Sequence, residues 1–478
     1  MMTSGAAWLL SLGFSITNPE TRLNIGWNSG SNLLSEPALI FDGISIPLAL
    51  SLAGIFLYTT LSQRFSPPQL AWISTLGGIC YLTVLSDNVY TFLLFWTLIE
   101  IFWITYSVFN QAVTERDIRL ILPIVVRLGS PLLLIYAALI GLEEGINAHF
   151  SGFNTAAGQI LIYAGVFGLI VLFLGAESTI FDGEKVDLER ILRLLPAIIS
   201  IMLITRGAEI MDLILVQSGL KIIIAILSLL LGLLSIISTN RERTIKIWSY
   251  GVIGLIAAGA LFFSSSISLS WGMVLLLPGV LIFQSYKSKS QLTVALVIVS
   301  IGMIPLPFLP AWNGSGLFTD GGSGFLFAIT AGILIGGIFS KNLSLVYEEE
   351  VPSDPIPLLY ILSPIILLIT QVVIALEYNL LRASREFLSI PILVWIPVFL
   401  IVLFYVFGER IPVLNTFRVE EKIQSTGKLI SLFASGAVKF VNQTLDLITN
   451  LFEGEGGLVW ALLIGFLLLT LITLSGGL

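Results

Sequence analysis

Long apolar blocks alternate with short polar breaks along almost the whole chain. About fifteen blocks of roughly 16–24 residues follow one another, close to the length that a helix needs to cross the hydrocarbon core of a bilayer. We place them near residues 5–17, 38–61, 69–86, 88–109, 120–141, 156–176, 192–206, 219–238, 246–264, 269–285, 291–309, 323–340, 356–376, 388–407 and 457–475. The pattern predicts an all-α, polytopic transmembrane helix bundle of about 14–16 spans. Residues 1–407 form the bundle in this interpretation, and residues 457–478 form a C-terminal anchor helix.

Residues 408–456 interrupt this pattern. They are too polar to span a membrane, yet their apolar residues recur at helical spacing, which is typical of an amphipathic helix on the membrane surface. A continuous helix of about 40 residues would reach roughly 60 Å. Gly427 and Gly436 can bend it, so one helix or two are both compatible with the pattern. This lateral helix either lies on its own bundle or reaches onto a neighbouring subunit.

The positive charges predict an orientation. Lys and Arg gather in every second loop, and such loops face the cytoplasm or its topological equivalent. The amino terminus and the segment after Phe407 then lie on that side, in a bacterial inner or plasma membrane or a thylakoid-type membrane. The opposite loops carry acidic residues such as Asp87 and Glu209. His149 also falls in one of these loops, where we expect a solvated side chain.

Composition excludes several classes of function. The 23 Lys and Arg residues against 30 Asp and Glu leave a net charge of −7 without a basic patch, so we expect contact with lipids and none with nucleic acid. One cysteine, Cys80, and one histidine, His149, rule out an internal disulfide and a multi-histidine metal site. No phosphate-binding or dinucleotide motif occurs, so we expect no cofactor, no metal and no catalytic site in this chain.

Two ionisable residues, Glu100 and Arg127, lie well inside apolar blocks. A charge in hydrocarbon costs about 2.5 kcal/mol or more, so it is normally paired or functional. Arginine cannot lose its charge, and a carboxyl group without a partner there is expected to be protonated. We therefore expect an intramembrane ion pair between neighbouring spans. It either locks two helices together or relays protons; alternatively, Arg127 extends to the interface.

Four segments carry a resemblance to a known family. They are Phe41-Asp-Gly-Ile-Ser-Ile-Pro47, Asn88 with Phe92-Leu-Leu-Phe-Trp96, Gly232–Asn240 with Arg241–Tyr250, and Ile301-Gly-Met-Ile-Pro-Leu-Pro307. Together they resemble the antiporter-like membrane subunits of respiratory complex I and of multisubunit cation/proton antiporters. A lateral helix followed by one terminal span is similar to the large distal member of that family. The resemblance implies a fold with antiporter-like inverted repeats and a place among other membrane subunits.

The charges that the family uses for ion translocation are largely replaced. Thr97 stands where the family has its glutamate, and Glu100 lies one helical turn further on nearly the same face. Phe167 and Ile198 lie near the positions of two basic residues, and Trp312-Asn313 near a third charged position. The resemblance thus implies a membrane-arm subunit of a complex I-like oxidoreductase with a mainly structural and coupling role. Two alternatives are ion translocation through Glu100, Arg127 and Thr97, and an unrelated transporter or lipid-embedded enzyme.

Overall fold

A computed structural model describes the following residues: 2–17, 21–24, 37–62, 66–110, 127–143, 149–174, 184–211, 218–237, 241–283, 289–319, 321–348, 358–380, 396–400 and 403. All of them belong to one compact unit, Met1–Asn28 with Leu34–Gly408. The lateral helix expected over residues 408–456 and the anchor helix expected over 457–478 lie outside the described residues.

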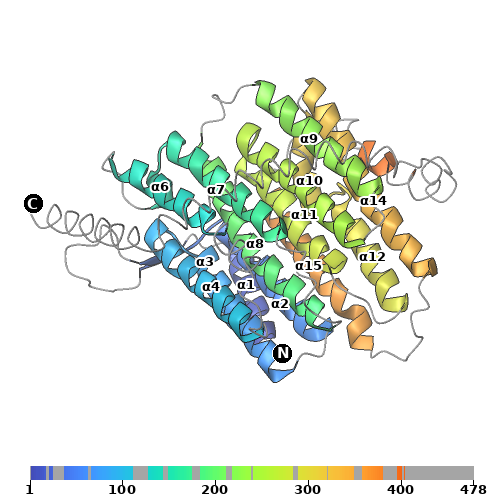
Figure 1. The fold of residues 1–478 in the computed structure, drawn as a ribbon, viewed down its shortest axis with the longest axis horizontal. Helices are drawn as coiled ribbons and strands as arrows, with labels where there is room; N and C mark the ends of the chain where they lie inside the picture. The colour runs from blue at the N-terminus through green and yellow to red at the C-terminus, as the bar shows by residue number, and fades with distance from the viewer. Residues whose placement is uncertain are drawn as a thin grey trace, which may run out of the picture. The chain divides into compact units, whose positions relative to one another are not determined.

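Long helices run side by side in this unit (Figure 1). They are α1 (Met2–Thr17), α2 (Ser45–Ser62), α3 (Pro67–Val84), α4 (Val89–Asn110), α6 (Gly129–Glu143), α7 (Thr155–Leu174), α8 (Glu184–Ile210), α9 (Ser218–Ile237), α10 (Arg241–Phe262), α11 (Ser265–Phe283), α12 (Lys289–Met303), α14 (Gly321–Glu348) and α15 (Leu358–Leu380). Short elements join them: the strands β1 (Thr21–Asn24) and β2 (Ala38–Phe41), the 3₁₀ turns η2 (Phe150–Gly152) and η5 (Ser315–Thr319), and the short helix α13 (Pro310–Gly314).

The predicted all-α transmembrane bundle is confirmed. Within the described ranges, four helical stretches are both long and apolar enough to cross a membrane: Ser45–Ser62, Thr155–Phe173, Thr244–Phe262 and Ser265–Phe283. Shorter apolar stretches occur in α4, α6, α9, α12, α14 and α15. Exposed Leu and Ile side chains on α4, α6 and α9 match surfaces that face lipid or neighbouring subunits.

Two predicted spans have different boundaries. Residues 38–41 are a strand rather than the start of a span, because they pair antiparallel with β1 and leave the helix to begin at Ser45. The span expected over 291–309 ends as a helix at Met303, since Pro305 and Pro307 cannot donate backbone hydrogen bonds to continue it.

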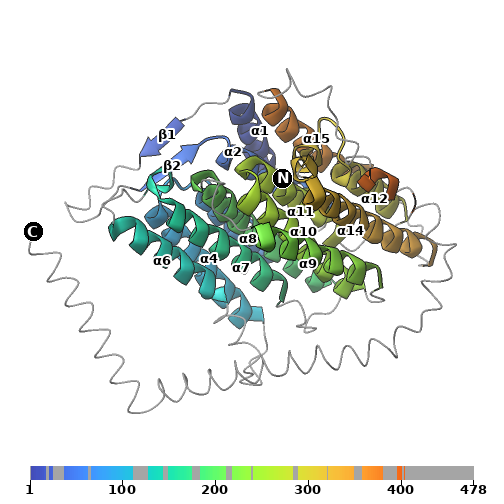
Figure 2. The same cartoon turned by 90° about the horizontal axis from the view of Figure 1, so that it is seen from above.

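Glycines bring α7 and α8 into close contact near the middle of the bundle (Figure 2). A Cβ atom at Gly165 would lie 2.5 Å from the Ser200 carbonyl oxygen, and one at Gly207 would lie 2.5 Å from the Gly158 carbonyl oxygen. The two helices therefore meet backbone to backbone, as small residues allow in membrane proteins. This interface holds the elements that surround Glu100 and Arg127.

Candidate functional site

Glu100 and Arg127 form a two-point ion pair between α4 and the residues that lead into α6. The Arg127 Nε atom lies 3.1 Å from Glu100 Oε2, and Arg127 Nη2 donates to Glu100 Oε1 at 3.1 Å. The Glu100 side chain is only 12% exposed, and the Arg127 side chain is 15% exposed. A fork-to-fork contact of this kind is stronger and more directional than a single hydrogen bond. The structure thus brings together the two charges that the sequence singled out.

Two tryptophans of α4 complete the surroundings of the pair. Trp96 Nε1 donates to Glu100 Oε1 at 3.1 Å, one helical turn away. The Arg127 guanidinium lies 4.8 Å from the centre of the Trp103 ring, within the range of a cation–π interaction. Both charges are therefore held by protein groups from the same helix face, and their geometry is fixed from several sides.

A small cavity borders the ion pair on the side of α7 and α8. Its lining includes Glu100 and Arg127 together with Ser130, Gly168 and Ser200, and its free volume of about 20 Å³ is enough for one water molecule. The Ser130 hydroxyl donates to the Ala164 carbonyl oxygen at 2.6 Å. Gly168 is needed here because a Cβ atom would come within 2.6 Å of Ser200 Oγ. The cavity is polar at the ion pair and at two hydroxyl groups.

The other candidate position on α4, Thr97, does not join this group. Its side chain is exposed, and its hydroxyl donates to the Leu93 carbonyl oxygen of the same helix at 2.6 Å. Ile198 is fully buried, and the Phe167 ring packs against Gly129, where a Cβ atom would lie 2.5 Å from the ring. Apolar groups thus occupy the two positions where the resemblance implies basic residues.

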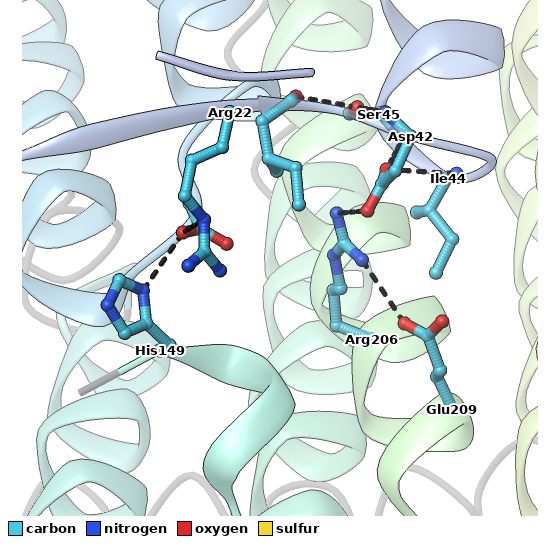
Figure 3. A network of polar contacts seen from close by, with 9 residues as sticks. Arg22, Asp42, Ile44, Ser45, His149, Arg206 and Glu209 are labelled. Atoms are coloured by element: carbon cyan, nitrogen blue, oxygen red, sulfur yellow. Dashed lines mark hydrogen bonds and ion pairs between the residues drawn. The ribbon is translucent and has the colours of Figure 1, made fainter. Parts of the chain in front are cut away.

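A second polar cluster joins α2 to α8 at one end of the bundle (Figure 3). Asp42 Oδ1 accepts hydrogen bonds from the backbone of Ile44 and Ser45, and so caps α2. Asp42 Oδ2 lies 2.6 Å from Arg206 Nη2, and Arg206 Nη1 donates to Glu209 at 3.1 Å. Burial alone would raise the pKa of Asp42, but Arg206 and the hydrogen bonds from Ser45 outweigh it and hold the pKa below its ordinary value of 3.8.

Beside this cluster, Asp87 contacts one arginine and one histidine. Its Oδ2 atom lies 2.7 Å from Arg22 Nε of β1 and 2.9 Å from His149 Nδ1 (Figure 3). The expectation that His149 is a solvated loop residue is wrong: its side chain is 23% exposed, and residue 149 pairs with Asn88 in a β-bridge. One signal in the sequence could have indicated these contacts. The alternation of charged loops places the segments that carry Arg22, Asp87 and His149 at the same end of the bundle.

No known protein family and no curated protein matches this sequence. Solved structures do match. A chain of the Mrp complex from Dietzia sp. DQ12-45-1b superposes with a TM-score of 0.62 at 12% identity, over 99% of this chain and 60% of the other. A chain of the membrane-bound sulfane sulfur reductase, an archaeal respiratory membrane complex, gives a TM-score of 0.63 at 14% identity, over 99% and 95%. A chain of respiratory complex I from Thermus thermophilus gives 0.60 at 14%, over 84% and 94%.

These matches decide the architecture. The chain has the antiporter-like fold of complex I-type membrane subunits. It spans about 60% of the length of the Mrp-complex chain and nearly all of the reductase chain. The protein is an integral, multi-pass membrane protein. Within its antiporter-like fold, the part of the chain that the structure describes contains no group of three or more His, Cys, Asp or Glu side chains placed to hold a metal ion.

Proposed function

We propose that this chain is a membrane-arm subunit of a complex I-like assembly, and that its antiporter-like fold serves mainly as a scaffold and coupling element. The observation that carries this proposal is the closed ion pair of Glu100 and Arg127. Each charge has its partner within 3.1 Å, and Trp96 and Trp103 occupy further sides of the pair. A carboxylate with partners on all these sides is held in one position, which suits a contact that braces two helices.

The replaced charges support the same proposal. Phe167 and Ile198 offer no titratable group on α7 and α8, and the close contact of these helices through Gly158, Gly165 and Gly207 leaves little room for water between them. The positive charge that balances Glu100 is instead that of the Arg127 side chain, which is permanent. A permanent cation can fix a carboxylate but cannot pass a proton on.

Ion translocation through Glu100 is the second candidate, and the cavity favours it. One water molecule at Ser130 and Ser200 would lie next to the carboxylate, and a chain of hydroxyl groups and water can carry protons. In this alternative, the ion pair opens during the cycle of the assembly, and Glu100 exchanges a proton with that water.

Transport by the purified assembly in proteoliposomes separates the two roles. Glu100→Gln removes the titratable group but keeps the acceptor for Trp96. Thr97→Val is the matched control on the same helix, because its side chain is exposed and bonded only to its own helix among the described residues. We expect transport per assembled complex to be equal in wild type, Glu100→Gln and Thr97→Val. A loss of at least tenfold in Glu100→Gln alone, with normal assembly, would refute the scaffold role and support translocation.

A further inference from the structure

A buried amide in α15 lacks the hydrogen bonds that its surroundings demand. Gln371 is 1% exposed, and neither Oε1 nor Nε2 has a hydrogen-bond partner among the described residues. The amide lies against Gly302 of α12, where a Cβ atom would come within 2.5 Å of Oε1 and 2.8 Å of Nε2. An amide in an apolar interior is costly unless both of its polar ends are satisfied.

The helix that faces this amide is shorter than a membrane span. α12 has 15 residues, so it rises about 22 Å, less than the roughly 30 Å of the hydrocarbon core. Pro305 and Pro307 carry no N–H group, so the carbonyl groups of Ile301 and Met303 lose the donors that a continuing helix would supply. These two carbonyl groups therefore have no helical donor, and they lie in the same helical turn as Gly302.

The connection that follows is strained and firmly held. Phe308 has a φ of 70°, a left-handed conformation that is rare for an aromatic residue. The Leu309 N–H group donates to the Leu306 carbonyl oxygen at 3.2 Å and closes a turn around Phe308. Six residues after Phe308, Trp271 Nε1 of α11 donates to the Gly314 carbonyl oxygen at 3.0 Å and fixes the end of α13. The break between α12 and α13 is thus a built feature, because the surrounding contacts maintain a conformation that the local chain disfavours.

We infer that this helix break binds a buried water molecule, which accepts from Gln371 Nε2 and donates to Gln371 Oε1 and to one of the carbonyl groups at the end of α12 that have no helical donor. The amide needs an acceptor for Nε2 and a donor for Oε1, while the carbonyl groups need donors. Water supplies both functions and adds no charge to apolar surroundings. A sodium ion would satisfy the oxygen atoms but leave Nε2 without an acceptor, and it would bring a charge into the interior.

This site gives the second half of the bundle a hydrated position without an ionisable group. α13 carries Trp312 and Asn313, where the family resemblance implies a lysine or glutamate, and both α12 and α13 pack on α15. Hydration at Gln371 is independent of the role proposed for Glu100, which lies on another helix.

Thermal unfolding of the purified assembly tests the inference through the sign of a shift. Gln371→Leu keeps the size of the side chain and removes both polar ends. If water bridges the amide, the melting temperature falls by a few degrees, because the water and the carbonyl groups lose their partner. If the amide is simply unsatisfied, its removal raises the melting temperature, and the inference is wrong. Thr330→Val is the control, because this buried hydroxyl donates within its own helix.

Two further measurements identify what binds at Gln371. A high-resolution cryo-EM map should show a density peak within hydrogen-bond distance of both Gln371 Oε1 and Nε2, and an empty break would overturn the proposal. The melting temperature should be the same in sodium chloride and in choline chloride at equal ionic strength. Stabilisation by sodium that disappears in Gln371→Leu would show a cation site instead of a water site.

Discussion

The Glu100–Arg127 pair predicts an unequal response to the loss of either partner. In Glu100→Gln, Arg127 keeps its charge in a largely buried position, since a guanidinium does not deprotonate in proteins. In Arg127→Met, Glu100 can take up a proton and become neutral. The double variant Glu100→Gln/Arg127→Met contains no buried charge. Of the three variants, Glu100→Gln should therefore be the least stable, because it leaves Arg127 charged and without its partner.

The structure sets the size of these effects. At an effective dielectric constant near 20, two charges about 4 Å apart attract by about 4 kcal/mol. Removing one member of a buried pair typically costs about 3–5 kcal/mol, because the other loses its compensation. We expect Glu100→Gln to lie in that range, Arg127→Met to cost about 2–3 kcal/mol, and the double variant to fall within about 1 kcal/mol of wild type. The two single costs then sum to about 5–8 kcal/mol, so the coupling between the two positions is at least about 4 kcal/mol.

Denaturant-induced unfolding in detergent micelles, followed by tryptophan fluorescence, measures all four members of this cycle. Thr97→Val supplies a reference for a harmless change on the same helix. The reasoning fails if the two single effects simply add in the double variant, or if Arg127→Met is more destabilising than Glu100→Gln. Either outcome would mean that solvent or another group, rather than the partner, balances these charges.

Two further predictions concern packing and pH. Gly165→Ala should destabilise the protein by about 1–3 kcal/mol, because the new Cβ would meet the Ser200 carbonyl oxygen, whereas Gly78→Ala, with nothing within 4 Å, should leave stability unchanged or slightly higher in the same unfolding experiment. Because the pKa of Asp42 is lowered on folding, its contact with Arg206 contributes stability that is present above about pH 4 and lost as pH falls further. Melting temperatures between pH 3 and pH 7 should therefore fall less steeply in Asp42→Asn than in wild type, and parallel curves would contradict this prediction.

The architecture was accessible from the sequence because its signal is distributed over hundreds of residues. Hydrophobic blocks of membrane length recur along the whole chain, and no single residue decides the count. The pairing of Glu100 with Arg127 was accessible for a related reason, since two charges in neighbouring apolar spans have few other ways to be satisfied.

Contacts between loops were much less predictable. His149 looked like a solvated residue because its neighbours are polar, and nothing local reveals a carboxylate 62 positions earlier in the chain at 2.9 Å. The orientation of Thr97 depends on the rotation of α4 within the bundle, which a nearly uniform apolar helix does not encode. From the sequence alone, Gln371 is expected to hydrogen-bond to a neighbouring helix. Only the packing shows that its side-chain amide lacks hydrogen-bond partners among the described residues.

The cluster around Asp42 has a consequence for the order in which the protein is made. Asp42 leaves the ribosome long before Arg206, and Arg22 and Asp87 likewise precede His149. At about 5–20 residues per second, the roughly 160 residues between Asp42 and Arg206 take about 8–30 s to synthesise. During that time Asp42, which directly follows β2, has no ion-pair partner on α8. Closure of this end of the bundle is therefore a late event of biogenesis, which completes only after α8 has been inserted.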